Sequence, residues 1–278
     1  MTEGRTWLRR GLSLITAPSP GRANALRIHG WLVGYQGIHA PALTSAEECC
    51  VLSTAADDAL EAAMALQVSA EVALHRGDEA VAVPLYKEAL TRFRACGDVL
   101  GTCACLFQFA LCHALRADAD PQRLHQAIEL CEEGMRISDA FDELWCRSWN
   151  QYVYGLGLWR LGQVRSAESA VLHSLGRKRR LRDRMGMGLC LELLAWIAAD
   201  DGRHEQAVRS FGAARRIWRE TEAPLAGFPQ LARFQEEATV RILDALGTEP
   251  AEHLLRHAEH LPIDQVLDEL LGETPPPI

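Results

Sequence analysis

Residues 70–89, AEVALHRGDEAVAVPLYKEA, place small residues and one glycine at fixed steps along the chain. Ala70 precedes Gly77 by seven positions, Ala82 follows Gly77 after five, and Ala89 follows Ala82 after seven. The same frame recurs at a period of about 40 residues: Gly30, Gly37, Ala42 and Cys49; Gly155, Gly162, Ala167 and Ser174; Ala195, Gly202, Ala207 and Ala214. A repeat of this length indicates a stacked array of short structural units.

The physical meaning of the frame is a helix hairpin. The first small residue lets one helix approach the next, and the glycine ends the first helix, where a left-handed conformation costs least. The two later small residues, seven apart, share one face of the second helix. Since a hairpin cannot bury both of its faces alone, each copy is expected to stack on its neighbours.

A further copy of the frame, the third along the chain, is imperfect. It keeps Ala110, Ala127 and Gly134, but Ala110 and Ala127 are 17 rather than 12 positions apart, so the turn RADADPQ holds the extra residues. Acidic residues mark the junctions between copies at Asp58, Asp98, Glu143 and Asp183. Apolar residues follow a helical period throughout, and no segment has the pattern of a strand. The sequence therefore predicts an all-α protein.

The stretch YGLGLWRLG (residues 154–162) could also suggest a phosphate-binding loop. Gly155 and Gly162 take the two glycine positions of a repeat, and such a loop would follow a strand. The chain has two lysines, Lys87 and Lys178, and neither follows a glycine, which excludes a P-loop. These glycines are predicted to belong to a helix and its turn.

The small–x6–Gly–x4–small–x6–small skeleton resembles the tetratricopeptide repeat (TPR). The resemblance implies a right-handed superhelical solenoid, with a half-repeat and turn in residues 1–20, five repeats in 21–224, and a helical cap and tail in 225–278. The stretches HGWLVGYQG, LELLAWIAADDGRHEQAVRSFGAARRIWRETEAPL and EGRTWLRRGLSLI resemble more particularly the MalT-like TPR region of bacterial LuxR-type and signal-transduction ATPase regulators. The period of 40 and the leucine at the usual early tryptophan depart from the standard TPR.

The composition narrows the class of protein. The 278 residues carry a formal net charge of −8, which argues against direct binding to nucleic acid or an anionic membrane. No apolar run reaches the ~18 residues of a membrane helix. Nine cysteines at irregular spacing, without C-x-x-C, favour buried reduced thiols in a cytoplasmic protein.

The TPR resemblance implies that the first helix of each hairpin lines a concave groove that takes a protein or peptide. Carrying the TPR groove positions over gives a set rich in aromatic residues and arginine, a composition that suits recognition. The set is Arg27, Trp31, Tyr35, Gln67, Glu71, His75, Gln108, Trp149, Tyr152, Trp159, Arg160, Glu192 and Trp196. The alternative is that several of these aromatic side chains only fill space between long helices.

Two other clusters carry competing interpretations. A basic patch is formed by Arg177, Lys178, Arg179 and Arg180 and extended by Arg209, Arg215, Arg216 and Arg219. This patch is a solvated helix end, a contact for an acidic partner domain, or a nucleic-acid contact. His253, His257 and His260 share one helical face and could bind a metal or simply be exposed.

No catalytic motif such as G-x-S-x-G occurs, and the carboxylates are dispersed over helices, so we expect no enzyme and no cofactor. The sequence favours a sensor or interaction region of a bacterial transcriptional or signalling regulator, with an NTPase or DNA-binding partner domain. The alternative is a stand-alone TPR adaptor or co-chaperone. An in-frame upstream extension encoding a missing first helix and a P-loop would favour the regulator.

Overall fold

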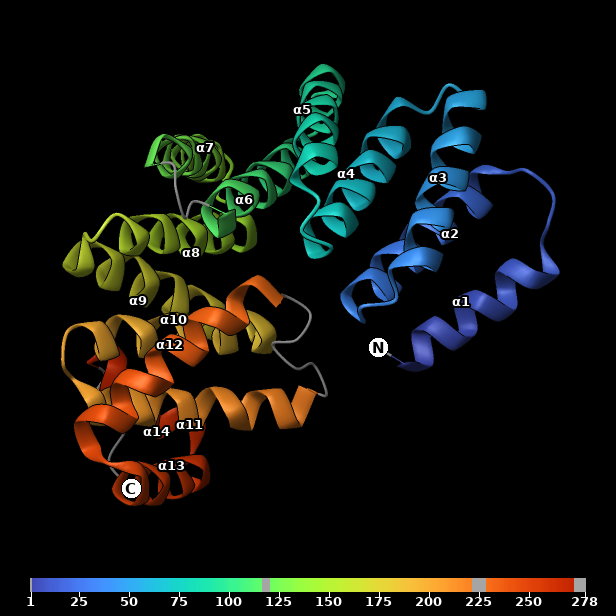
Figure 1. Cartoon of the computed structure of the whole chain (residues 1–278). Helices are drawn as coiled ribbons and strands as arrows, with labels where there is room; N and C mark the ends of the chain where they lie inside the picture. The colour runs from blue at the N-terminus through green and yellow to red at the C-terminus, as the bar shows by residue number, and fades with distance from the viewer. Residues whose placement is uncertain (1, 117–120, 222–228, 273–278) are drawn as a thin grey trace. The chain divides into compact units, whose positions relative to one another are not determined.

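The computed structural model describes residues 2–116, 121–221 and 229–272. The insertion in RADADPQ, the bend after Pro224 and the TPPPI tail fall wholly or largely outside these ranges. Within them, the chain forms fourteen α-helices and no strand (Figure 1). They are α1 (Thr2–Leu14), α2 (Pro20–Tyr35), α3 (His39–Ala55), α4 (Ala59–His75), α5 (Glu79–Cys96), α6 (Val99–Arg116), α7 (Pro121–Ala140), α8 (Leu144–Arg160), α9 (Val164–Leu181), α10 (Arg184–Asp200), α11 (His204–Thr221), α12 (Pro229–Leu246), α13 (Thr248–His260) and α14 (Ile263–Leu271).

The chain divides into two compact units, Met1–Cys112 and His113–Ile278. The boundary falls inside α6, in the imperfect copy of the repeat. In the N-terminal unit α2 packs against α3, α4 packs against α5, and α1 packs against α2. In the C-terminal unit α8 packs against α9 and α10 against α11, while α7 packs against α8. Each unit is therefore built from stacked antiparallel hairpins.

The hairpin turns confirm the role assigned to the repeat glycines. Gly37, Gly77, Gly162 and Gly202 have φ angles of 74°, 73°, 75° and 76°. A side chain in this left-handed region would be strained, and glycine is not. The first helix of each of these hairpins consequently ends where the frame places its glycine.

The small residues of the frame lie at the helix contacts. A Cβ atom added to Gly155 would lie 2.6 Å from Val171 Cγ2, and one added to Gly30 would lie 3.1 Å from the carbonyl oxygen of Ala42. The remaining small positions include residues with no exposed surface: Ala42, Cys49, Ala70, Ala82, Ala89, Ala110, Ala167, Ala195, Ala207 and Ala214. Close approach of paired helices is therefore what the frame encodes.

The acidic residues at the junctions cap the helices that follow them. The Asp58 carboxylate accepts a hydrogen bond from the backbone N–H of Glu61, Glu143 accepts from Trp145 and Cys146, and Asp183 accepts from Gly186. Helix N-termini have unpaired N–H groups, and a carboxylate at the N-cap satisfies them. This local requirement explains why the acidic residues share the period of the repeat.

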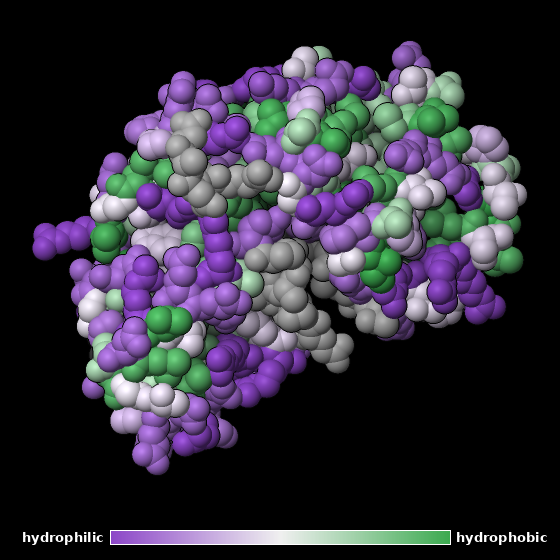
Figure 2. All heavy atoms as spheres, in the orientation of Figure 1, coloured by the Kyte–Doolittle hydropathy of each residue, from purple (hydrophilic) through white to green (hydrophobic). Residues whose placement is uncertain are grey.

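Three helices follow the last hairpin. Helix α12 packs against α10, α13 packs against α11, and α14 packs against α9 and α11. On the face drawn in Figure 2, hydrophobic residues occur in small groups among hydrophilic ones. Within the described ranges, none of the helices combines the length and the apolar composition of a membrane span.

Candidate functional site

The first helices of the hairpins, α2, α4, α6, α8 and α10, are called the A helices here, and α3, α5, α7, α9 and α11 the B helices. The predicted groove residues lie on the A helices. Several of them contact a neighbouring A helix: Arg27 pairs with Glu61, Gln67 bonds Gln108, and Trp159 meets Trp196. These residues define an A-helix surface in each unit.

In the N-terminal unit the A-helix surface is polar. Gln67 Nε2 donates to Gln108 Oε1 at 2.7 Å, and Gln108 Nε2 donates to Glu71 Oε1 at 3.4 Å. Arg27 Nε lies 2.7 Å from Glu61 Oε1 across the step from α2 to α4. The structure therefore brings the predicted residues of α4 and α6 together in one hydrogen-bonded chain.

The other predicted residues of this unit differ in exposure. Trp31 is 39% exposed, which leaves much of its indole ring accessible to a ligand. His75 is buried, and burial, with the nearby His39 as a lesser cause, lowers the pKa of His75 to about 4. Tyr35 ends α2, and its side chain lies outside the described part of the structure.

In the C-terminal unit the A-helix surface is aromatic. The rings of Trp159 and Trp196 lie 5.7 Å apart, and the Phe234 ring of α12 lies 5.1 Å from the first and 5.4 Å from the second. Trp159 also donates its Nε1–H to Asp200 Oδ2 at 2.8 Å. Aromatic rings at these separations attract one another beyond simple burial. The predicted tryptophans thus form a site that a helix of the same chain fills.

Two arginines flank the inserted ring. The guanidinium carbons of Arg160 and Arg233 lie 5.0 Å and 4.5 Å from the centroid of Phe234. Arg160 donates to the carbonyl oxygen of Ala114, and Arg233 donates to that of Leu115, each at 3.0 Å. Both carbonyls lie in the last turn of α6, where helix carbonyls lack partners. Phe234 is therefore enclosed by aromatic and cationic groups from α8, α10 and its own helix α12.

Glu192 is a buried carboxyl in the same site. Its Oε1 accepts hydrogen bonds from Trp218 Nε1 at 3.1 Å and from Gln235 Nε2 at 3.4 Å. Burial raises the pKa of Glu192 to about 7, although the hydrogen bond from Trp218 and the charge of Arg215 act in the opposite direction. The carboxyl group is therefore poised to change its charge near neutral pH.

Trp149 and Tyr152 do not join these surfaces. Both are buried, and the Lys178 ammonium of α9 lies 3.4 Å from the centroid of the Trp149 ring. Burial strongly raises the pKa of the Tyr152 hydroxyl, with Cys190 and Glu192 nearby. These two side chains are packed between helices and are not accessible on the A-helix surface.

Lys178 departs from the expected basic patch, because its side chain has no exposed surface. Its Nζ lies 3.3 Å from Asp183 Oδ2, and burial lowers its pKa. The other members, Arg177, Arg179 and Arg180, line a cleft of about 920 Å³ with leucines of α14. Arg179 pairs with Asp268 of α14 at 2.7 Å. The patch thus contacts an acidic helix of its own chain.

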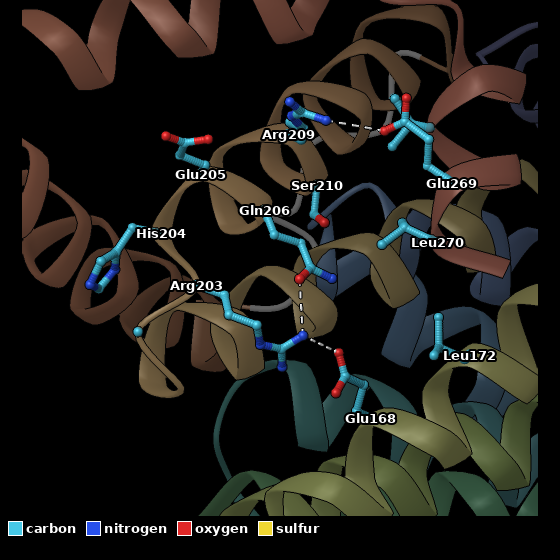
Figure 3. A pocket seen from close by; sticks show the side chains of 12 residues that line it. Glu168, Leu172, Arg203, His204, Glu205, Gln206, Arg209, Ser210, Glu269 and Leu270 are labelled. Carbon is cyan, nitrogen blue, oxygen red and sulfur yellow. Dashed lines mark hydrogen bonds and ion pairs between the residues drawn. The ribbon is translucent and has the colours of Figure 1, made fainter. Parts of the chain in front are cut away.

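A neighbouring pocket of about 610 Å³ lies among α9, α11 and α14 (Figure 3). Arg203 reaches Glu168 at 2.6 Å, and Arg209 reaches Glu269 at 3.3 Å. Figure 3 shows these side chains turned toward one another across the pocket. Paired charges of this kind hold helices together, and the arrangement does not isolate an acid or base for catalysis.

The interpretation of the histidine cluster as a metal site finds no support, and the cysteines at two buried positions have unreactive thiols. Among the described residues, no three or more His, Cys, Asp or Glu side chains gather so as to hold a metal ion, His253, His257 and His260 included. Burial raises the pKa of Cys49 and of Cys105 to about 12. A thiol with such a pKa stays protonated at neutral pH and is a poor nucleophile.

Sequence reasoning missed the residues of α12 that occupy the aromatic site. Leu231, Phe234, Ala238 and Ile242 form a buried stripe on α12. Their spacing of three, four and four is visible in the sequence and predicts an amphipathic helix. The spacing does not indicate which surface the stripe covers, because that depends on the direction in which the chain folds back.

Neither the family models nor the curated proteins contain a match to this chain. Among solved structures, the chain is similar to a Rap protein complexed with competence and sporulation factor. The TM-score is 0.62 at 14% identity, and the match covers 88% of this chain and 77% of that one. At this identity the likeness concerns the fold, and it shows that the chain has the expected all-α, TPR-like superhelical architecture.

Proposed function

We propose that the chain is a non-catalytic scaffold that binds a protein or peptide on the A-helix surface. The observation that carries this proposal is that the surface of the C-terminal unit already holds a helix, with the Phe234 ring packed against both Trp159 and Trp196. Buried aromatic and arginine side chains are the residues that most often dominate binding energy. The solved Rap protein with the same fold is itself seen in a complex.

The biological setting proposed is a bacterial regulator. Its support is the resemblance of residues 29–37 and 191–225 to MalT-like TPR regions, and the TPR-like fold. In this setting, ligand binding changes the stacking of hairpins and so transmits occupancy to an NTPase or DNA-binding partner domain. The basic cleft of Arg177 and Arg180 would contact an acidic surface of that partner. A stand-alone adaptor or co-chaperone remains the second candidate.

The binding function is tested with peptides selected from a display library against the full chain. We expect Trp31→Ala and Arg27→Ala each to lower the affinity of a peptide that binds the N-terminal unit, by about tenfold or more. Val51→Ala is the matched control, because Val51 is 68% exposed on a B helix, away from the A-helix surface. Selection of peptides whose binding responds to Val51 and to neither Trp31 nor Arg27 would contradict the proposal.

The regulator and the adaptor differ in their response to the ligand. A regulator must change its conformational distribution when occupied, because a ligand shifts an equilibrium only through different affinity for two states. We expect small-angle scattering of the full chain to change on saturation with the selected peptide. An unchanged scattering curve at saturation would favour the adaptor.

A further inference from the structure

Helix α12 contacts A helices from successive hairpins of the C-terminal unit. Arg233 reaches the Leu115 carbonyl of α6, which is 118 residues away. Phe234 contacts Trp159 of α8 and Trp196 of α10, and Arg241 Nη1 lies 3.2 Å from Asp200 Oδ1 of α10. Helix α12 therefore lies on the A-helix surface, where the proposed ligand would bind.

One face of α12 makes these contacts. Leu231, Phe234, Ala238 and Ile242 are buried, whereas Val240 is 56% exposed and Glu236 and Glu237 point to solvent. An amphipathic helix that lays an apolar stripe into a groove is a recurrent mode of peptide recognition. Helix α12 is thus bound by the A helices in the manner of a helical ligand.

The contacts of α12 also define which types of side chain the site accepts. The aromatic site takes the Phe234 ring, the Leu115 carbonyl of α6 accepts from the Arg233 guanidinium, and Glu192 accepts from the Gln235 amide. Carbonyls at a helix C-terminus favour cations because of the helix dipole. A helix with an arginine directly before a phenylalanine satisfies these groups together.

We propose that the C-terminal A-helix surface recognises an amphipathic helix with an Arg–Phe pair, and that α12 is the chain's own occupant of this site. A partner helix of the same chemistry binds by replacing α12. This inference rests on the proposed binding function and names its ligand class.

Tethering explains why α12 holds the site against a free competitor. A segment linked to its own binding site acts at an effective concentration of about the millimolar range. A free helix of equal intrinsic affinity at micromolar concentration therefore displaces little of it. Weakening the tethered copy, with the receptor residues kept intact, exposes the site to the free helix.

The test uses the full chain and a fluorescently labelled peptide with the sequence of residues 229–246. Fluorescence polarisation compares the wild type with Phe234→Ala and with Val240→Ala, which changes the exposed face of α12. We expect Phe234→Ala to bind the peptide about 100-fold more tightly than the wild type, because it loses a buried aromatic anchor. Val240→Ala should match the wild type.

Two further variants define recognition. A peptide carrying Phe234→Ala should lose its binding to the Phe234→Ala chain, and Trp159→Ala combined with Phe234→Ala in the chain should abolish binding of the unmodified peptide. If Phe234→Ala fails to fold by circular dichroism, the double variant Arg233→Ala and Arg241→Ala takes its place. That variant weakens two polar contacts, and about a tenfold gain in peptide affinity is expected.

The inference is overturned if a folded variant with weakened α12 binds the peptide no better than Val240→Ala does. It is also overturned if the Phe234→Ala peptide binds as well as the unmodified one. Neither result rejects the proposed function. That function is tested separately by peptides that bind the N-terminal unit through Trp31 and Arg27. Loss of both kinds of binding would reject the proposed function as well.

Discussion

The two units use the same hairpin geometry to present different chemistry. In the N-terminal unit, Gln67, Glu71 and Gln108 join neighbouring A helices by hydrogen bonds. In the C-terminal unit, the corresponding contacts are made by Trp159 and Trp196 and are covered by Phe234 of α12. The repeat frame therefore determines where helices meet, while the residues between the frame positions determine the chemistry that each surface presents.

The largest expected contrast lies in the exposed and buried tryptophans of the two surfaces. Trp196→Ala should lower the free energy of unfolding of the C-terminal unit by about 3–5 kcal/mol, because it removes a fully buried aromatic side chain. Trp31→Ala should change the stability of the N-terminal unit by less than about 1 kcal/mol, since Trp31 is 39% exposed. Hydrogen exchange measured by mass spectrometry assigns each loss to its unit. Equal losses would remove the contrast.

The second contrast concerns two capping carboxylates at equivalent junctions. Asp58→Ala should cost about 1 kcal/mol, the usual cost of losing an N-cap. Asp183→Ala should cost about 3 kcal/mol, because it also leaves the buried Lys178 ammonium without its carboxylate. Urea denaturation followed by circular dichroism compares them. Lys178→Met combined with Asp183→Ala should recover part of the larger loss, and failure to do so would remove the ion pair as its cause.

The third contrast is between a glycine at a close helix contact and one without neighbours. A Cβ added to Gly212 of α11 would lie 2.7 Å from the backbone carbon of Ala258 in α13, so Gly212→Ala should destabilise by about 1–3 kcal/mol. Gly11 of α1 has no atom within 4 Å of such a Cβ, so Gly11→Ala should stabilise by about 0.5–1 kcal/mol. Thermal melts of both variants check the opposite signs.

The fourth contrast is in the pH dependence of stability, which has opposite signs in the two units. The pKa of Glu192 is raised to about 7, so its folded form binds the proton more tightly and its stabilising contribution is lost as pH rises through about 7. The pKa of His75 is lowered to about 4, so the unfolded chain binds the proton more tightly and stability falls as pH drops below the ordinary histidine pKa toward 4. Each slope is at most about 1.4 kcal/mol per pH unit, the value for one proton.

The measurement is the urea concentration at which each unit is half unfolded, determined between pH 5 and pH 8. Hydrogen exchange, corrected for intrinsic exchange rates, monitors the unfolding of each unit. Glu192→Gln should remove the loss at high pH from the C-terminal unit and leave the N-terminal unit unchanged. His75→Gln should remove the loss at low pH from the N-terminal unit. Parallel pH responses in both units of the wild type would contradict the assignment.

The all-α hairpin architecture can be predicted from the residue pattern alone. Turn glycines such as Gly77, junction caps such as Asp58 and small contact residues such as Ala82 answer requirements that arise within about 40 residues of chain: a left-handed φ, an unpaired N–H group and a short interhelical distance. Each requirement is local, so the residue types repeat with the structural unit and can be read as a pattern.

The occupant of the A-helix surface, by contrast, is visible only in the folded chain. Phe234 meets Trp159 across 75 positions, and Lys178 turns inward to Trp149 and Asp183 although it stands in a basic run. Two features follow from the amount of apolar surface and charge that each possible packing arrangement buries. They are the direction in which α12 folds back and the face of its helix on which Lys178 lies. That balance is set by contacts distant in sequence, which leave no periodic pattern to read.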